Sequence, residues 1–287
     1  MRIALLGAAG QLGRDLAPRL PGEVILLSRA DLDLSNPADI LAVVSAVNAD
    51  VFVNCAAYNL VDRAESDPAA AFATNGTGVL ALANACAAAR TKLVHFSTDY
   101  VFGLDATHTI PFTEDDTPGP VSAYGLSKLV GEYAVRAAHP GNLVIRTCGL
   151  YGRWGSGGKG GNFVETMLRL AGEGKPLRVV ADQCCTPSYT VDVADATAAL
   201  IRDNAVGLFH VTNAGSCSWF EFAREIFRLS SLAPNLTPIT SAGFGAPARR
   251  PAFSVLGTAK LITLGVSPRP WPEALAAYIV ERRITTV

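Results

Sequence analysis

A tyrosine and a lysine, Tyr124 and Lys128, stand four residues apart in the stretch VSAYGLSKLVGE. Residues four apart on an α-helix lie on the same face, one turn from each other. A phenol with its ordinary pKa of about 10 exchanges protons near neutral pH only if its pKa is lowered. One cation about 4 Å away supplies about 4 kcal/mol at an effective dielectric constant near 20, or about three pKa units. The pair therefore has the chemistry of an acid and the cation that tunes it.

The helix that carries this pair should begin after Ser122, a residue suited to cap a first turn. At about 100° per residue, one side of it forms an apolar stripe, which we expect to be the buried side. Tyr124 and Lys128 lie on the opposite side, which either is solvated or lines a ligand cleft. The stripe consists of Leu126, Leu129, Val130, Tyr133 and Ala137.

A second group of polar residues, Ser97, Thr98 and Asp99, ends the apolar run KLVHFST just before this helix. Ligands of open α/β sheets bind at the carboxyl ends of the strands. A threonine hydroxyl there can donate a hydrogen bond to a substrate carbonyl, and the alternative is that Ser97 or Thr98 only caps a turn.

The elements that must position these residues alternate regularly between strand and helix. Near-continuous apolar strands indicate a sheet buried on both faces, and the alternation predicts an α/β fold of the Rossmann type with a doubly wound parallel sheet. We expect strands at 2–8, 23–28, 50–56, 92–98 and 142–152, and helices at 11–20, 37–47, 68–89 and 123–138.

A glycine turn, Gly7, Gly10 and Gly13, follows the first strand directly and opens a helix. The first glycine permits a tight turn, the second lets a diphosphate approach the backbone, and the third lets helix and strand pack closely. Helix amides then face the phosphates. The spacing G-x-x-G-x-x-G at the start of an alternating α/β pattern predicts dinucleotide binding.

The second strand ends in Ser28 and Arg29, where an NAD enzyme would be expected to carry an acid. A guanidinium suits a 2′-phosphate, so NADPH is favoured. NADH stays possible, because Asp31 or Asp33 could reach the ribose instead.

After residue 151 the alternation of strands and helices stops, and a glycine-rich loop follows. Its GGKGG stretch lacks a Ser or Thr after Lys159 and fails as a phosphate loop. We expect an NAD(P)-binding Rossmann domain at 1–150 and a smaller α/β, mainly substrate-binding domain at 151–287, with some later segments returning to the first. Further elements are expected at 163–172, 177–182, 190–203, 207–213, 219–231 and 272–282.

Composition excludes several classes of function. A net charge of -1 over 287 residues gives no reason to expect nucleic acid or a membrane surface. No apolar run is long enough to span a bilayer, so we expect a cytoplasmic protein. The six cysteines show no C-x-x-C spacing, and we expect no metal site. Adjacent Cys184 and Cys185 are expected to be free thiols rather than a strained disulfide.

The motifs GAAGQLG, FSTDYVFG and YGLSK, together with VNCAAYNLVDRAESDP and DQCCTPSYTVDVA, resemble the dTDP-4-dehydrorhamnose reductase family. This family belongs to the extended short-chain dehydrogenase/reductase superfamily, and the resemblance runs almost end to end. The Tyr-x-x-x-Lys pair marks only the superfamily. The STDYVF stretch and the pattern Arg250, Pro251, Ser254 are more specific.

The resemblance implies a role for each matching residue. Tyr124 would donate the proton, Lys128 would bind the nicotinamide ribose and lower the Tyr124 pKa, and Thr98 would tune the tyrosine. The substrate would meet Thr98, Asp99, Asn162, Phe163 and Arg250. The cofactor would meet Gly7, Gly10, Gln11, Leu12, Gly13, Ser28, Arg29, Asp33, Leu34, Ala57, Tyr58, Asn59, Phe96, Tyr124 and Lys128.

The implied reaction is NADPH-dependent reduction of the 4-keto group of a nucleotide-linked 6-deoxyhexose, first of all dTDP-4-dehydro-L-rhamnose. One alternative is a sugar-nucleotide epimerase or dehydratase, although a dehydratase would need more carboxylates beside Thr98 than Asp99. Another is a non-catalytic NADP-binding subunit, against which the presence of Tyr124 and Lys128 counts. A homodimer is left open.

Two departures from the family pattern fall in the substrate half. The family commonly has RTSWVYG where this chain has RTCGLYG, so Gly149 replaces a tryptophan that would pack on the sugar. Trp154 is a candidate replacement. Cys185 stands where the resemblance leads us to expect a glycine.

Overall fold

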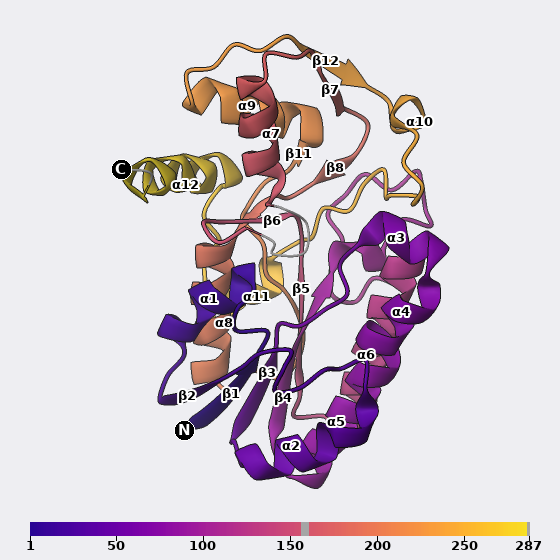
Figure 1. The fold of residues 1–287 in the computed structure, drawn as a ribbon, viewed down its shortest axis with the longest axis vertical. Helices are drawn as coiled ribbons and strands as arrows, with labels where there is room; N and C mark the ends of the chain where they lie inside the picture. The colour runs from indigo at the N-terminus through magenta and orange to yellow at the C-terminus, as the bar shows by residue number, and fades with distance from the viewer. Residues whose placement is uncertain (156–160, 286–287) are drawn as a thin grey trace.

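The computed structural model describes residues 1–155 and 161–285, so Lys159 of the GGKGG stretch lies outside the described residues. Figure 1 shows a sheet flanked by helices, with a second group of helices and short strands beyond its upper end. No helix in the described part of the chain is long and apolar enough to cross a membrane.

The central sheet has six strands, all parallel, in the order β10-β5-β4-β3-β1-β2. The predicted doubly wound sheet is confirmed. The chain order reverses beside β1, so the carboxyl ends of β1 and β3 form the switch point where such sheets bind ligands. The strands are β1 (Arg2–Leu6), β2 (Glu23–Leu27), β3 (Val51–Asn54), β4 (Lys92–Thr98), β5 (Leu143–Thr147) and β10 (Gly207–His210).

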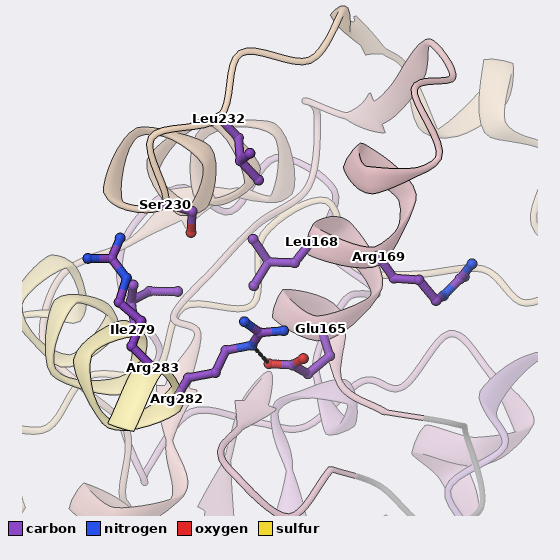
Figure 2. Close-up of a pocket in the computed structure, with 8 residues that line it drawn as sticks. All are labelled: Glu165, Leu168, Arg169, Ser230, Leu232, Ile279, Arg282 and Arg283. Atoms are coloured by element: carbon purple, nitrogen blue, oxygen red, sulfur yellow. Dashed lines mark hydrogen bonds and ion pairs between the residues drawn. The ribbon is translucent and has the colours of Figure 1, made fainter. Parts of the chain in front are cut away.

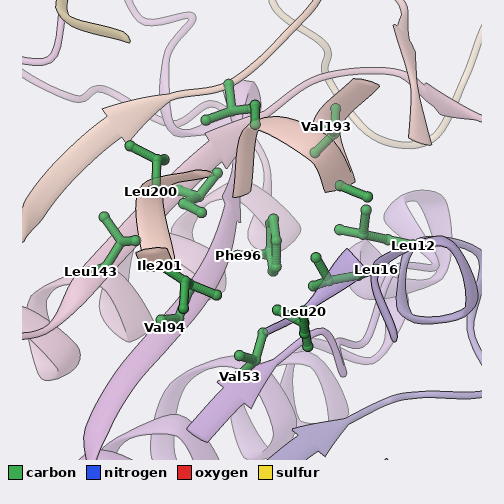
Figure 3. Close-up of a cluster of buried hydrophobic side chains, with 14 of the residues drawn as sticks. Leu12, Leu16, Leu20, Val53, Val94, Phe96, Leu143, Val193, Leu200 and Ile201 are labelled. Carbon is green, nitrogen blue, oxygen red and sulfur yellow. The ribbon is translucent and has the colours of Figure 1, made fainter. Parts of the chain in front are cut away.

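Two apolar layers cover the sheet because its strands alternate their side chains between the faces. On one face α1 (Gln11–Leu16) and α8 (Thr190–Arg202) pack over Leu5, Val53 and Phe96 (Figure 3). On the other face Leu6, Phe52 and their neighbours meet α2 (Ile40–Val47), α5 (Gly78–Ala88) and α6 (Ala123–Ala138).

A smaller unit sits at the carboxyl end of the sheet (Figure 1). Its apolar centre contains Tyr151, Phe222 and Tyr278. Around it lie α7 (Phe163–Gly172), α9 (Trp219–Leu229) and α12 (Trp271–Thr285), all three close to their expected positions. Its strands pair in twos: β7 (Leu177–Val180) with β12 (Leu236–Ile239), β8 (Cys184–Cys185) with β11 (Cys217–Ser218), and β6 (Leu150–Tyr151) with β9 (Ser188–Tyr189).

Segments of the second half return to the first unit, as expected. Strand β10 forms an edge of the main sheet and α8 covers one face, with Leu261 of α11 (Ala259–Thr263) beside it. The expected boundary near residue 150 therefore marks where the chain first leaves the sheet, not where the sheet is complete.

Two local differences concern the region between β3 and β4. The sequence pattern did not predict α3 (Val61–Ser66). The single helix expected at 68–89 is divided into α4 (Pro68–Phe72), a π-helical turn over Ala73–Thr77 and α5. Asn75 in that turn is buried and bonds both backbone polar groups of Tyr58, which ties the turn to the loop after β3.

The expected orientation of α6 is wrong. Leu126, Val130 and Tyr133 of the predicted core stripe are 46%, 37% and 52% exposed, whereas Lys128 and Glu132 are 2% and 0% exposed. The helix thus turns charged residues toward the sheet. This is possible because β4 and β5 supply hydrogen-bonding partners for these charges, which periodicity along one helix cannot reveal.

Candidate active site

Helix α6 brings Tyr124 to the carboxyl end of β4. Ser122 caps the helix as predicted, accepting a hydrogen bond from the Gly125 amide at 3.1 Å. A side chain at Gly125 would place its Cβ 2.2 Å from the Tyr100 carbonyl oxygen, so only glycine lets the helix approach this closely. Tyr100 also meets the Tyr124 ring edge-on, with ring centroids 5.9 Å apart.

The Tyr124 hydroxyl shares a hydrogen bond with the Thr98 hydroxyl. Burial raises the pKa of Tyr124 to about 12, while the Thr98 hydrogen bond opposes the rise. The net shift is therefore upward, opposite in direction to the lowering expected from Lys128, because burial is the largest effect on the phenol. A phenol with a raised pKa holds its proton at neutral pH, which suits a proton donor.

Lys128 lies one helical turn further on and is 2% exposed. Its Nζ donates a hydrogen bond of 2.6 Å to the carbonyl oxygen of Phe96 in β4. Burial lowers the pKa of Lys128 to about 8, and the nearby Glu132 carboxylate acts against this lowering. The structure thus brings together Thr98, Tyr124 and Lys128, the three predicted catalytic residues.

Asp99, which is expected to face the sugar, is buried next to Thr98. Its side chain is 2% exposed and accepts hydrogen bonds from Ser254 Oγ at 2.6 Å, Cys148 Sγ at 3.1 Å and Thr98 Oγ1 at 3.1 Å. Burial raises the pKa of Asp99, and these donors oppose the rise. Asp99 therefore ties β4 to the loop after β5 and to the segment around Ser254.

The glycine turn lies at the switch point of the sheet. Gly7 has a φ of 79°, and a Cβ there would lie 2.8 Å from the Ala56 amide nitrogen. A Cβ on Gly13 would lie 2.3 Å from the Gly7 carbonyl oxygen, and one on Gly10 3.1 Å from it. Gln11 begins α1, and Leu12 packs into the core. The backbone is thus bare where a diphosphate would approach, as the motif predicts.

The residues after β2 form a small polar turn. Ser28 donates to Asp31 from its backbone amide and its hydroxyl, both at 2.7 Å. The Arg29 guanidinium is 82% exposed, with its Nε 2.9 Å from Asp33. Asp31 is therefore engaged by Ser28, and Arg29 is the charged group that reaches into solvent. The Leu34 side chain is buried in the core, so only its backbone can meet an adenine.

The loop after β3 supplies the remaining predicted cofactor residues. Ala57 is exposed, whereas Tyr58 and Asn59 are half-buried. Asn75 holds the Tyr58 backbone and also donates to Ser127 Oγ on α6 at 3.0 Å. Phe96 is 7% exposed and contributes its carbonyl oxygen to Lys128.

The three predicted substrate residues other than Thr98 and Asp99 each have a structural role. Asn162 caps α7, with its Nδ2 2.8 Å from the Gly152 carbonyl and 3.3 Å from Gln11 Oε1. Phe163 packs on Trp219, with ring centroids 4.7 Å apart. Arg250 pairs with Asp62 at 2.9 Å and is 18% exposed on its side chain. Asn162 thus connects the second unit to the glycine turn.

Two cavities lie away from these residues. One of about 310 Å³ opens between α7, α9 and α12, where Arg282 meets Glu165 at 2.7 Å (Figure 2). Another of about 280 Å³ lies beside Asp192 and Arg269. Neither contains a predicted site residue. Within residues 1–155 and 161–285, no group of three His, Cys, Asp or Glu side chains is placed to hold a metal ion.

Comparison with known proteins agrees with this geometry. The family model described as the RmlD substrate binding domain matches residues 1–284. The chain belongs to this family. It is 43% identical to a probable dTDP-4,6-dihydroxy-2-methyloxan-3-one 4-ketoreductase from Streptomyces antibioticus, covering 96% of this chain and 93% of that protein. A dTDP-4-dehydrorhamnose reductase from Mycolicibacterium smegmatis is 41% identical, covering 96% and 84%.

A solved structure in the RmlD family has the same fold. The dTDP-4-dehydrorhamnose reductase from Bacillus anthracis, determined in complex with NADP, superposes with a TM-score of 0.91 at 36% identity. The match covers 98% of this chain and 99% of that one.

The aromatic residue beside Gly149 is Trp219, which the sequence reasoning missed. Gly149 has a φ of 52°, and a Cβ there would lie 3.2 Å from both Pro187 Cα and Trp219 Cη2. Trp154, the candidate replacement, instead donates its Nε1–H to Asp15 Oδ1 at 3.0 Å. The aromatic ring beside position 149 is therefore that of Trp219, from a helix 70 residues further along the chain.

Cys184 and Cys185 are free thiols, as expected. All six cysteines are free, and Cys185 lies buried opposite Cys217 in the β8–β11 pair. Cys185 and Cys148 are in side-chain contact beside Asp99.

Proposed function

We propose that this chain reduces the 4-keto group of a dTDP-linked 6-deoxyhexose with NADPH, and that its substrate is dTDP-4-dehydro-L-rhamnose. The observation that carries the proposal is the hydrogen bond between the Thr98 and Tyr124 hydroxyls, with Lys128 one turn along the same helix. Thr98 ends β4 and the glycine turn follows β1, and because the strands are parallel both lie at the carboxyl edge of the sheet. The proposed acid and the proposed cofactor site therefore share one edge of the sheet.

The cofactor fits the residues present. The glycine turn leaves no side chain between the backbone and a diphosphate, and Arg29 offers an exposed guanidinium at the end of β2. A guanidinium can bind a 2′-phosphate through two hydrogen bonds, so NADPH is preferred to NADH. When bound, NADPH supplies the hydride.

The protein residues handle the proton and the developing charge. Tyr124, with a pKa of about 12, holds its proton at neutral pH and gives it to the C4 oxygen as negative charge forms there. Thr98 and the protonated Lys128 stabilise the phenolate that remains. Donors set in place before the reaction need little rearrangement, which is why their hydrogen bonds matter more here than in water.

A second substrate within the same chemistry is supported by two observations. The Streptomyces antibioticus relative is named as a ketoreductase of a more deoxygenated sugar, and this chain departs from the expected family pattern at Gly149 and Cys185. A dTDP-4-keto sugar lacking a further hydroxyl is therefore the alternative to dTDP-4-dehydro-L-rhamnose.

The test follows NADPH oxidation by purified protein with each dTDP-4-keto sugar. We expect turnover with dTDP-4-dehydro-L-rhamnose, and a higher kcat/KM for the deoxygenated sugar would select the alternative. Tyr124→Phe should lose about 10²- to 10⁴-fold in kcat while its NADPH Kd stays unchanged. NADPH binding without oxidation of NADPH by either sugar would refute the proposal.

A further inference from the structure

A buried carboxylate, Glu132, lies one helical turn beyond Lys128 on the same face of α6. It is 0% exposed and accepts hydrogen bonds from Arg146 Nε at 2.9 Å and Arg146 Nη2 at 2.7 Å. Ser97 Oγ adds a third hydrogen bond to Glu132 at 2.5 Å. Both Glu132 oxygens are thus held by β4 and β5.

Strand β4, which holds Glu132 through Ser97, also holds Lys128 through Phe96. The Phe96 carbonyl oxygen accepts a hydrogen bond from the Lys128 ammonium, and the hydroxyl of the next residue, Ser97, donates one to the Glu132 carboxylate. Tyr124, Lys128 and Glu132 therefore form a row of acid, cation and anion along one side of α6. Arg146 closes the row from β5, and its guanidinium also lies 4.9 Å from the Phe102 ring centroid.

A fully buried ion pair rarely adds stability over apolar residues of similar size, since both ions lose their water. Its place directly behind the candidate catalytic lysine suggests a different use. A lone ammonium at 2% exposure is costly to keep charged, and a carboxylate about one turn away offsets that cost. The carboxylate in turn needs Arg146 and Ser97 in order to stay ionised and oriented.

We propose that Glu132, held by Arg146 and Ser97, is a positioning residue of the reductase that keeps Lys128 protonated for its work beside Tyr124. This inference rests on the proposed function for its meaning in catalysis. The proposed electrostatic link between Glu132 and Lys128 does not depend on that function.

Few other charges in the described part of the chain face the row. Cys55, from the loop after β3, and His95, from β4, lie within electrostatic reach of Lys128. Burial raises the pKa of the Cys55 thiol and lowers that of His95 well below 6.5, so both are neutral near pH 8. His210, from β10, lies beyond Arg146, with its Nε2 3.4 Å from Nη1. Glu132 is therefore the anion that acts on Lys128.

Loss of the Glu132 charge should lower the pKa of Lys128. Lys128 acts only while it carries its proton, which it loses as the pH rises through its pKa of about 8. Replacing Glu132 by a neutral residue removes an attraction that favours the charged ammonium. For charges about one helical turn apart, at an effective dielectric constant near 20, the Lys128 pKa should fall by about one to two units.

The experiment measures the Lys128 pKa itself. The chain has only five lysines, so protein labelled with ¹³C at lysine Cε gives few NMR signals, and Lys128→Arg identifies the one from Lys128. Wild-type and Glu132→Gln proteins are titrated from pH 6 to pH 11. Asp192→Asn is the matched control, because it breaks the Asp192–Arg269 ion pair, far from α6.

We expect the Lys128 midpoint to fall in Glu132→Gln and to stay in place in Asp192→Asn. If Glu132→Gln does not fold, the double variant Glu132→Gln with Arg146→Met avoids an unpaired guanidinium. Its Lys128 midpoint should also fall, but by less, because the repulsion between Arg146 and Lys128 is lost as well. An unchanged Lys128 midpoint in the variant that folds, or an equal fall in the control, would overturn the inference.

Activity supplies a separate readout. In Glu132→Gln the alkaline fall of kcat/KM should move to lower pH with the Lys128 midpoint. If the wild-type protein reduces no 4-keto sugar, the proposed function fails and the NMR titration still decides the role of Glu132.

Discussion

Adding a side chain at Gly149 should destabilise this protein. The residue has a φ of 52°, a left-handed conformation that costs an L-residue about 1–2 kcal/mol. An added Cβ also meets Pro187 Cα and Trp219 Cη2 at 3.2 Å, tighter than ordinary contact. Overpacking of this kind costs a further 1–3 kcal/mol. Gly149→Ala should therefore lose about 2–5 kcal/mol of unfolding free energy, and Gly149→Trp more.

Two other glycines separate these contributions. Gly174 has a φ of 69° and nothing within 4 Å of a built Cβ, so Gly174→Ala should show the conformational cost alone. Gly172, within α7, has neither the positive φ nor a neighbour, so Gly172→Ala should be neutral or stabilising. The assay is urea unfolding of all three variants under one condition. A Gly149→Ala protein no less stable than Gly174→Ala would refute the steric argument at Trp219.

Three more outcomes follow from the structure. Arg29→Ala should raise the Kd of NADPH about tenfold or more and leave that of NADH nearly unchanged, measured by cofactor fluorescence. Ser254→Ala should cost about 2 kcal/mol of unfolding free energy in urea, since it removes a 2.6 Å hydrogen bond from the buried Asp99; an unchanged midpoint would mean that Thr98 and Cys148 suffice. Burial and the adjacent Arg146 lower the pKa of His210 to about 3, so the folded state excludes a proton that the unfolded chain binds. Its contribution is full above about pH 6.5 and is lost as the pH falls toward 3, and His210→Gln should flatten this part of a stability-against-pH curve.

The sheet and most helices could be predicted because their signals are local. Buried parallel strands are continuously apolar, and Ser122 has the chemistry of a cap at the place where α6 begins. The candidate catalytic residues follow from spacing on one helix and from one strand end. The orientation of α6 could not be predicted in this way. Lys128 and Glu132 can be buried because they form hydrogen bonds with residues of β4 and β5.

Contacts between distant segments also explain why the surroundings of Gly149 and Asp99 could not be predicted from the sequence. Trp154 is near Gly149 in sequence, whereas Trp219 reaches it from α9, and no local pattern records such a contact. Asp99 stands at the expected strand end, yet Ser254, 155 residues away, determines where its carboxyl points. Strands of two residues, such as β8 and β11, also carry too little periodicity to be recognised.

The return of β10 and α8 to the main sheet limits how specificity can be exchanged between relatives. A chimera joined at residue 150 would replace the edge partner of β5 and one of the helices that packs on Leu12 and Leu16, both parts of the cofactor-binding layer. Such a hybrid should be unstable whatever sugar it is built for. Grafting only 150–189 and 213–256 would change the walls of the substrate site and keep β10 and α8 with the sheet they complete.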